Sequence, residues 1–349
     1  LLLLSIFSFY FIEKPFRNRS SKKLPLKIIF ISIFLLLLVN FLIISKHGYK
    51  DRFQDIIVEK NYDGNLWDLL KDNQGKSCLS NKDLCFFNKN KKDKIFLIGD
   101  SHTAVLSLDL KNRILKKKKY TMIVANRSGC IFFPKFNLIF LNDKKKTKCN
   151  DEYFSKLNNL FTEKDDNIII FGGRFSFYTT EKTYDNGEGG KEYSPWFENR
   201  TFSKIGKFDK IENSFKESVQ ILSNKNKIIL VYPIPEQGWN VPKKLHYQLL
   251  FKKNKNNLND KNNWITTSYD SYKKRTSDIF RMLDSISGDN IYRVYPHKLF
   301  CDTMVSERCI SHDDKDLFYG DDDHPSLKGA EMINELIMKE IEKIELKPL

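Results

Sequence analysis

Short apolar runs alternate with amphipathic stretches from about residue 91 to the end of the chain. Strands buried on both faces are expected at Ile95–Ile98, Thr121–Val124, Asn167–Phe171, Lys227–Tyr232 and Ile291–Tyr295. Apolar residues at helical spacing predict helices at Thr103–Leu115, Ile211–Leu222, Asp270–Ile286 and Leu327–Ile344. Strands that alternate with helices usually form a parallel sheet with helices on both faces. The sequence therefore predicts an α/β domain of three layers at residues 91–349.

Three polar segments do not follow this alternation. Residues 46–90 have mixed polarity and no sustained period, which predicts a stalk with a short helix near Leu66–Leu70. Residues 179–210 and 236–268 are rich in Asn, Lys and Glu and are expected to be loop insertions in the domain.

The first 45 residues carry two apolar runs separated by a basic loop. Residues 28–45 contain no charged side chain and are long enough to cross a hydrocarbon core of about 30 Å, which predicts a transmembrane helix. Residues 1–12 are also apolar and are expected to be the end of an earlier span. Six basic residues between the runs predict that the loop at 13–27 is cytoplasmic, so the chain from residue 46 onward is expected outside. Because the chain begins with Leu1 and not with Met, we expect it to be the C-terminal part of a longer protein.

Six cysteines fall into three close pairs. They are Cys78 and Cys85, Cys130 and Cys149, and Cys301 and Cys309. No pair has the two-residue spacing of a zinc knuckle or of a thioredoxin-like redox motif. An even count grouped in this way favours disulfides and an oxidising compartment over buried free thiols. The local spacing favours pairing in sequence order, although six cysteines allow 15 connectivities.

The net charge of +15 comes mostly from Lys residues that are spread along the chain. Such a balance fits nucleic-acid binding, an anionic lipid surface, an anionic glycan or a solvated surface of biased composition. No RNP, zinc-finger or helix-turn-helix pattern is present, and the Lys residues alternate with Asn in stretches such as 252–263. A solvated surface is therefore preferred, and no nucleic-acid partner is expected.

A candidate nucleophile, Ser101, follows the first predicted strand in the sequence Gly99-Asp100-Ser101-His102. A serine between a strand and a helix presents its hydroxyl at the carboxyl end of the sheet, near amides that stabilise negative charge. The glycine allows the tight turn. Asp and Ser are also ordinary helix caps, so this turn alone does not identify an active site. His102 is expected to pack or to cap the helix.

A candidate base, His324, lies just before the last predicted helix in Asp321-Asp322-Asp323-His324. A carboxylate three residues ahead of a histidine is able to accept its Nδ1 proton, which leaves Nε2 free to deprotonate a serine. Asp321 has that spacing, and Asp322 and Asp323 are further candidates. Three consecutive aspartates also fit a calcium loop, but that site needs neither the histidine nor the serine turn. No metal is therefore expected.

The Gly99-Asp100-Ser101 and Asp321-x-x-His324 motifs resemble the first and last blocks of the SGNH (GDSL-like) hydrolase superfamily. Ser128-Gly129-Cys130 is similar to its glycine block, which implies that the Gly129 amide helps to bind the oxyanion. The Asn block is replaced by Phe171-Gly172-Gly173-Arg174-Phe175. That departure leaves Gly173 or Arg174 as the candidate third donor.

The N-terminal segment Tyr10–Arg17 resembles the end of the membrane domain in acyltransferase-3 proteins, some of which carry a C-terminal SGNH domain outside the membrane. Cys301-Asp302 and Cys309, shortly ahead of the Asp-x-x-His block, also resemble this fused subgroup. The resemblance implies O-acylation, usually acetylation, of an envelope or extracellular polysaccharide. It further implies acetyl-CoA as the donor for the missing membrane domain and no cofactor in the SGNH domain.

By this resemblance the expected partners are a glycan acceptor, the lipid bilayer and the N-terminal acyltransferase-3 domain of the same protein. The expected location is the inner membrane, with the SGNH domain facing the periplasm or the exterior. A glycan O-acetyl esterase with the same triad and a non-catalytic glycan-binding domain remain alternatives. Trp67 is expected to be a core or loop residue, and Trp196 and Trp239, in the insertions, are open to a stacking role.

Overall fold

The computed structural model describes residues 2–17, 24–46, 66–79, 84–141, 147, 149–192, 200–204, 210–251 and 260–347. The chain divides into two compact units, Leu1–Ile57 and Val58–Leu349. The predicted fold belongs to the second unit. Residues 18–23 of the predicted basic loop and Trp196 lie outside the described residues.

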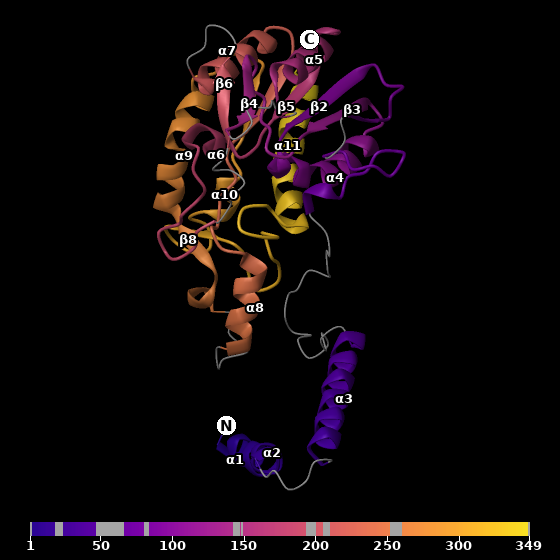
Figure 1. Cartoon of the computed structure of the whole chain (residues 1–349). Coiled ribbons are helices and arrows are strands. Elements are labelled where there is room, and N and C mark those ends of the chain that lie inside the picture. The colour runs from indigo at the N-terminus through magenta and orange to yellow at the C-terminus, as the bar shows by residue number, and fades with distance from the viewer. Residues whose placement is uncertain are drawn as a thin grey trace. The chain divides into compact units, whose positions relative to one another are not determined.

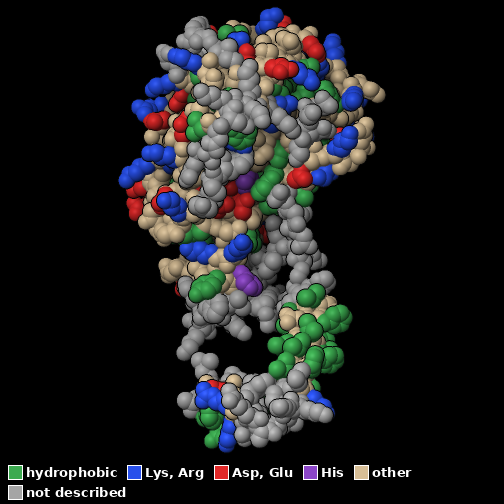
Figure 2. Space-filling model, in the orientation of Figure 1, with side chains coloured by type: hydrophobic (Ala, Val, Ile, Leu, Met, Phe, Trp, Pro, Cys, Tyr) green, Lys and Arg blue, Asp and Glu red, His purple; other side chains and the backbone are tan. Residues whose placement is uncertain are grey.

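The described part of the first unit is helical. It consists of α1 (Leu2–Ser8), a π-helical turn η1 (Phe9–Glu13), α2 (Lys14–Arg17) and α3 (Leu24–Ser45). Figure 2 shows hydrophobic side chains gathered on α3, where residues such as Phe30, Leu37 and Phe41 are exposed. Among the described residues, however, no helix combines the length and the hydropathy needed to cross a membrane. The transmembrane helix predicted at 28–45 is therefore not confirmed, although the run does form a helix.

The second unit is built on a sheet of six strands in the order β1-β3-β2-β5-β7-β9. The strands are β1 (Cys85–Phe87), β2 (Asp93–Gly99), β3 (Tyr120–Asn126), β5 (Ile168–Phe171), β7 (Lys227–Val231) and β9 (Ile291–Val294). All neighbours pair in parallel except β1, which is antiparallel to β3. The five strands predicted from the sequence are the five parallel strands, so the predicted α/β fold with a parallel sheet is confirmed.

Helices cover both faces of this sheet (Figure 1). Two separate hydrophobic cores lie between the sheet and these helices. Alternate residues of each strand point to opposite faces, so Ile95 and Leu97 of β2 enter one core while Phe96 and Ile98 enter the other. The first core is completed by α4 (Ser101–Lys116) and α11 (Leu327–Leu346). The second is completed by α5 (Asp151–Thr162), α7 (Ile211–Ser223) and α9 (Tyr269–Asp284). This is the three-layer arrangement that the alternation predicted.

Several short elements were not predicted. Two small antiparallel pairs join β4 (Phe136–Phe140) to β6 (Arg200–Lys204), and β8 (Thr266–Ser268) to β10 (Arg308–Ile310). Three further short helices are α6 (Phe175–Thr180), α8 (Val241–Phe251) and α10 (His297–Phe300), and the longer helix α5 was not predicted either. Of these elements, β6, β8, α6 and α8 lie in or beside the predicted insertions, where the polar composition conceals their few apolar positions.

The prediction of a stalk at 46–90 needs correction at its C-terminal end. β1 lies inside this range, yet its residues pair with β3, and both Cys85 and Phe87 are buried. Leu66 is also buried in the core that α4 and α11 complete. The described residues 66–79 and 84–90 therefore belong to the second compact unit, because their apolar side chains are buried there.

The three disulfides form between the cysteine pairs predicted from local spacing. Cys78 is bonded to Cys85, Cys130 to Cys149, and Cys301 to Cys309. The structure describes no free cysteine. Disulfides of this kind persist in oxidising compartments, so the domain has the character of an extracytoplasmic protein.

Candidate active site

Ser101 is the first residue of α4, and one residue, Asp100, separates it from the carboxyl end of β2. Asp100 is the N-cap of this helix, and its Oδ1 accepts a hydrogen bond of 2.9 Å from the His102 amide. Asp100 Oδ2 accepts two further bonds, from the Arg174 amide at 3.0 Å and from the Tyr178 hydroxyl at 2.9 Å. The buried carboxylate thus fixes the serine turn to the segment after β5, while Ser101 itself remains half-buried.

His324 lies in a tight turn just before α11. Asp321 Oδ1 accepts hydrogen bonds from the Asp323 amide at 3.0 Å and from the His324 amide at 2.7 Å. Such bonds from an aspartate to amides two and three residues later close a turn locally. The Gly320 amide also donates to the His324 carbonyl at 2.9 Å. The spacing of the motif therefore holds the backbone as well as the side chain of the histidine.

The serine, the histidine and a carboxylate are in contact. His324 Nε2 lies 2.8 Å from Ser101 Oγ, and His324 Nδ1 lies 2.8 Å from Asp321 Oδ2. These are hydrogen-bond distances, so Asp321 is placed to hold the Nδ1 proton and leave Nε2 facing the serine. The predicted residues Ser101, His324 and Asp321 are thus brought together in the order that a serine acyl-transfer triad needs.

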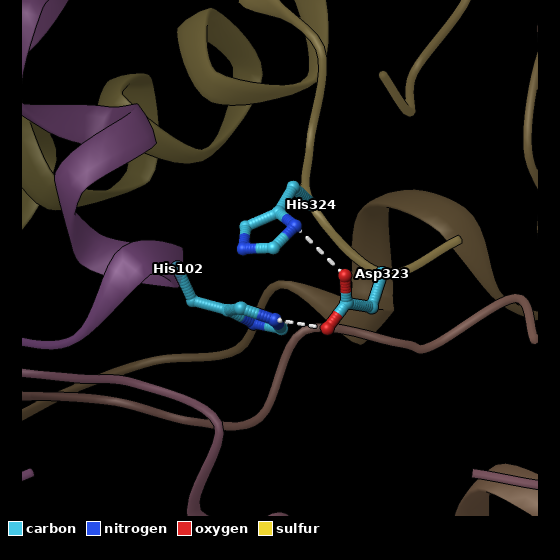
Figure 3. Close-up of side chains that lie close together, drawn as sticks. All are labelled: His102, Asp323 and His324. Carbon is cyan, nitrogen blue, oxygen red and sulfur yellow. Dashed lines mark hydrogen bonds and ion pairs between the residues drawn. The ribbon is translucent and has the colours of Figure 1, made fainter. Parts of the chain in front are cut away.

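A second carboxylate, Asp323, also reaches His324. Its Oδ1 lies 2.8 Å from Nδ1 of His324, and its Oδ2 lies 3.0 Å from Nε2 of His102. Figure 3 shows the carboxylate between the two imidazoles, with one oxygen directed at each ring. His102 is buried, and it also contributes its amide to the N-terminal turn of α4. The expectation that His102 packs or caps is therefore met in part, but its ring has a polar partner in the site.

Arg174 is the cationic residue that contacts Asp323 and two further carboxylates. Its Nη1 lies 2.7 Å from Asp323 Oδ2, and its guanidinium also bonds Glu192 and Glu236. Arg275 pairs with the other oxygen of Glu236 at 3.0 Å. Arg174 is only 9% exposed, and all three of its guanidinium nitrogens are engaged by carboxylates. These contacts give the arginine a positioning role and leave its side chain committed.

Electrostatics set the charge states of the site. Burial lowers the pKa of His324, but the carboxylates of Asp323 and Asp321 outweigh burial and raise it well above its usual value. Burial raises the pKa of Asp323, but Arg174, His324 and His102 together hold it well below the usual range. Burial and the neighbouring carboxylates raise the pKa of Asp322 to about 6. The imidazole is therefore stabilised as the imidazolium that proton transfer from a serine produces.

The candidate oxyanion donors Gly129 and Gly173 lie on the loops after β3 and β5, the two strands that flank β2. Gly129 lines the cavity beside Ser101 in the turn after β3, where its φ of +67° favours glycine. Gly173 has a φ of +139°, and a Cβ there would lie 2.8 Å from the Ile131 side chain. A side chain at position 173 would therefore require both a strained backbone conformation and a shift of Ile131. The Arg174 amide is already bonded to Asp100, so the third donor stays a prediction.

A cavity of about 240 Å³ opens onto the nucleophile. Ser101, His324, Ser128, Gly129 and the three aspartates line it, together with Trp67, Asp100, Arg174, Phe177, Tyr178 and Glu192. The Trp67 ring packs against the His324 ring, with centroids 4.3 Å apart and planes inclined by 34°. Trp67 was expected to be a core or loop residue, and no sequence pattern linked it to the histidine. Glu192 lies in the predicted insertion at 179–210 and was missed for the same reason.

Two groups of side chains in this site have the spacing of metal ligands. Ligand atoms of Asp321, Asp322 and Asp323 lie within 4.8 Å of one another, and so do those of His102, Asp323 and His324. In both groups Asp323 already bonds the Arg174 guanidinium. The positive charge of Arg174 opposes a cation at this position.

Comparison with known proteins places this geometry in context. Residues 70–339 match the family model described as "SGNH domain (fused to AT3 domains)". Among the curated proteins, no match is found. The matched range begins after Trp67 and includes every catalytic candidate named above.

Solved structures resemble the chain at low identity. The periplasmic domain of a lipopolysaccharide acetyltransferase from Salmonella ser. Paratyphi A is 19% identical, with a TM-score of 0.44, and the match covers 72% of this chain and 84% of that one. A GDSL-like lipase from Bacteroides thetaiotaomicron is 15% identical, with a TM-score of 0.37 and coverage of 73% and 90%. An acetyl xylan esterase, AlAXEase, is 11% identical, with a TM-score of 0.36 and coverage of 71% and 99%.

Proposed function

The chain belongs to the family of SGNH domains fused to AT3 domains, and from this premise we propose that it is an O-acyltransferase acting on a polysaccharide outside the cytoplasm. The observation that carries the proposal is the contact of Ser101 Oγ with His324 Nε2 at 2.8 Å, beside a cavity lined by Gly129. A serine, a base and a carboxylate in this order form an ester with an acyl group and then release it.

In the first half-reaction, His324 Nε2 takes the proton of Ser101 as Oγ attacks the acyl carbonyl. Amides of Ser101 and Gly129 are the candidate donors to the oxyanion that develops. Asp321 and Asp323 stabilise the imidazolium, which then gives its proton to the leaving group. In the second half-reaction, a sugar hydroxyl gives its proton to His324 and takes the acyl group, and the proton returns to Ser101 Oγ. Acetyl is the acyl group that the family resemblance favours.

The acyl donor belongs to another part of the proposed system. Acetyl-CoA would be used by the AT3 domain of the full-length protein, and the residues of this chain would only receive the acyl group. The three disulfides support a location of the SGNH domain in the periplasm or at the cell exterior. The glycan acceptor and the inner-membrane location of the full-length protein are part of the same proposal.

The proposal is tested by measuring ester-linked acetyl on cell-envelope polysaccharide from cells that carry the full-length protein. Wild type is expected to raise the acetyl content, and Ser101→Ala is expected to remove the increase. Arg281→Ala is a suitable control, because Arg281 is highly exposed and its ion-pair partner among the described residues is Asp278, three positions away. If cells with Ser101→Ala had the same acetyl content as cells with the wild-type protein, the proposed transferase function would be wrong.

Hydrolysis is the competing outcome, because water is able to replace the sugar in the second half-reaction. An esterase would release acetate from an acetylated polysaccharide and form no new ester. A fall of acetyl content in cells with the wild-type protein, abolished by Ser101→Ala, would therefore support the esterase. A non-catalytic glycan-binding domain would produce no change in ester content in either direction.

A further inference from the structure

Trp67 lies against His324, the base that takes the proton of the acceptor in the proposed second half-reaction. The residue lies in the short helix η3 (Leu66–Asp68), far in sequence from the triad, yet its indole packs on the imidazole of His324 at 4.3 Å. It is half-buried and also lines the cavity that opens onto Ser101. The triad alone needs no aromatic residue here, because Asp321 and Asp323 already hold Nδ1 of the histidine.

The segment that carries Trp67 is fixed to the domain on both sides of the indole. Leu66 is buried against Gly320, where the Leu66 side chain fills the space that a Cβ at 320 would occupy. Further along, the Cys78 amide donates to the Leu70 carbonyl at 2.9 Å, and the disulfide from Cys78 to Cys85 ties the segment to β1. A half-buried indole held in this way is a fixed wall of the cavity.

We propose that Trp67 forms the acceptor wall of the site and favours a carbohydrate hydroxyl over water as the group that takes the acyl chain. The apolar ring limits the approach of water along the His324 side of the cavity. The same ring offers a flat apolar surface to the C–H groups of a sugar, which positions a hydroxyl near Nε2. This inference rests on the proposed acyl transfer and adds the residue that separates it from hydrolysis.

The removal of the acyl group from Ser101 is the same reaction with a sugar hydroxyl and with water, except for the oxygen that attacks. A sugar hydroxyl attacks the carbonyl of the acyl ester on Ser101 and passes its proton to His324 Nε2. The bond between the carbonyl carbon and Ser101 Oγ breaks, and Oγ recovers the proton from the imidazole. Water in place of the sugar gives acetate and the same free serine. A change at Trp67 is therefore expected to alter the ratio of the two products more than it alters the acylation of Ser101.

The test uses the full chain with p-nitrophenyl acetate as donor, methyl β-D-glucopyranoside as a ring acceptor and glycerol as an acceptor without a ring. The burst of p-nitrophenol reports acylation of Ser101 and the fraction of folded enzyme. The ratio of acetylated glucoside to free acetate reports how the acyl group on Ser101 is divided between the sugar and water. We expect Trp67→Ala to lower this ratio about tenfold while a burst still shows that Ser101 is acylated, and Trp67→Phe to stay within about threefold of wild type. Transfer to glycerol is expected to fall less than transfer to the glucoside.

An unchanged ratio of acetylated glucoside to acetate in Trp67→Ala would overturn the inference, even if transfer and hydrolysis both slowed. Trp67 would then only support His324. If Trp67→Ala shows no burst, Trp67→Leu keeps an apolar side chain in the segment but removes the flat ring. The same ratio then decides the question in that variant. Wild-type enzyme that hydrolyses the ester but acetylates neither acceptor would instead overturn the proposed acyl transfer itself. The two failures are therefore distinguishable.

Discussion

Ser101 Oγ and His324 Nε2 lie 2.8 Å apart although the two residues are 223 positions apart in the chain. The sheet brings them together, because Ser101 follows the carboxyl end of the central strand β2 while His324 precedes α11, which packs against α4. The contact joins the N-terminal end of α4 to the turn that precedes α11.

The first prediction concerns the nucleophile. A serine-directed fluorophosphonate is expected to label the wild-type protein and to leave Ser101→Ala unlabelled, because only a deprotonated serine attacks the phosphorus. Ester cleavage is expected to fall on the order of 10⁴-fold in the same variant. Ser128→Ala is the matched control, since Ser128 lines the same cavity and the described residues show no hydrogen bond from its side chain to His324. Labelling of Ser101→Ala, or its loss in Ser128→Ala, would contradict the assignment.

Most of the fold could be predicted because it depends on local patterns. The five parallel strands are continuous apolar runs, and α4, α7, α9 and α11 repeat apolar residues at helical spacing. The serine turn and the Asp321-to-His324 turn could also be predicted, because each is closed by side-chain bonds to nearby amides. A short signal along the chain was sufficient for each of these features.

The rest of the site depends on contacts that leave no local signal. The rings of Trp67 and His324 pack together although the residues are 257 positions apart in the sequence (324 minus 67). No periodic pattern predicts this contact. Glu192 and Glu236 lie in or near polar insertions, where nothing distinguishes them from solvated residues until Arg174 is placed between them. β1 was assigned to a stalk because three residues are too few to establish a period.

The second prediction is a pH dependence that follows from the raised pKa of His324. Because only the neutral imidazole accepts the serine proton, kcat/KM for p-nitrophenyl acetate should rise with pH through the folded-state pKa, above the usual value of about 6.5. The imidazolium contributes stability that is complete below the unfolded-state pKa and is lost as pH rises through the folded-state pKa.

Asp322 provides the control for this pH profile. Its pKa is raised to about 6, so its titration could be mistaken for that of the histidine. Asp322→Asn is expected to leave the ascending limb in place, because in the described part of the chain His324 is bonded to Asp321, Asp323 and Ser101 and not to Asp322. An inflection at or below about pH 6.5 in wild type would contradict the raised pKa of His324.

The third prediction concerns the buried charge of Arg174. Arg174→Met removes the one cation that contacts all three of Asp323, Glu192 and Glu236, so these largely buried carboxylates would lose part of their counter-charge. Breaking a buried ion pair in this way typically costs about 3–5 kcal/mol in the free energy of unfolding. Urea unfolding followed by circular dichroism measures the loss. Arg281→Ala, at an exposed pair with Asp278, should change it by less than about 1 kcal/mol. Equal effects of the two variants would be inconsistent with the buried network.

The fourth prediction concerns the disulfide between Cys130 and Cys149, which spans 19 positions of the sequence. Replacing both cysteines by Ala should lower the free energy of unfolding by about 3 kcal/mol, because the unfolded chain gains freedom. Cys130 directly follows Gly129, so acylation of Ser101 should also slow. Replacing Cys301 and Cys309, whose disulfide is not next to a candidate oxyanion donor, should affect stability with less effect on acylation. Urea unfolding and the p-nitrophenol burst rate separate the two effects.

The last prediction separates the two carboxylates that hold His324 Nδ1 at 2.8 Å. Asp321 also closes the turn through two amides, and asparagine keeps an oxygen for those bonds. Asp323 is buried and shares its charge with His102 and Arg174. In either Asn variant, the remaining carboxylate is expected to keep the imidazole in its reactive orientation.

Each single variant should therefore lose activity only modestly, with the ascending limb of the pH profile moved to lower pH because one negative charge is gone. The double variant should lose on the order of 10⁴-fold, since no carboxylate would then hold Nδ1. The loss should greatly exceed the product of the single effects, because each carboxylate substitutes for the other. If Asp321→Asn alone is as inactive as the double variant, Asp323 does not orient the histidine, and the contact between them serves only to place His102 and Arg174. Measured kcat/KM across the pH range for the three variants decides between these cases.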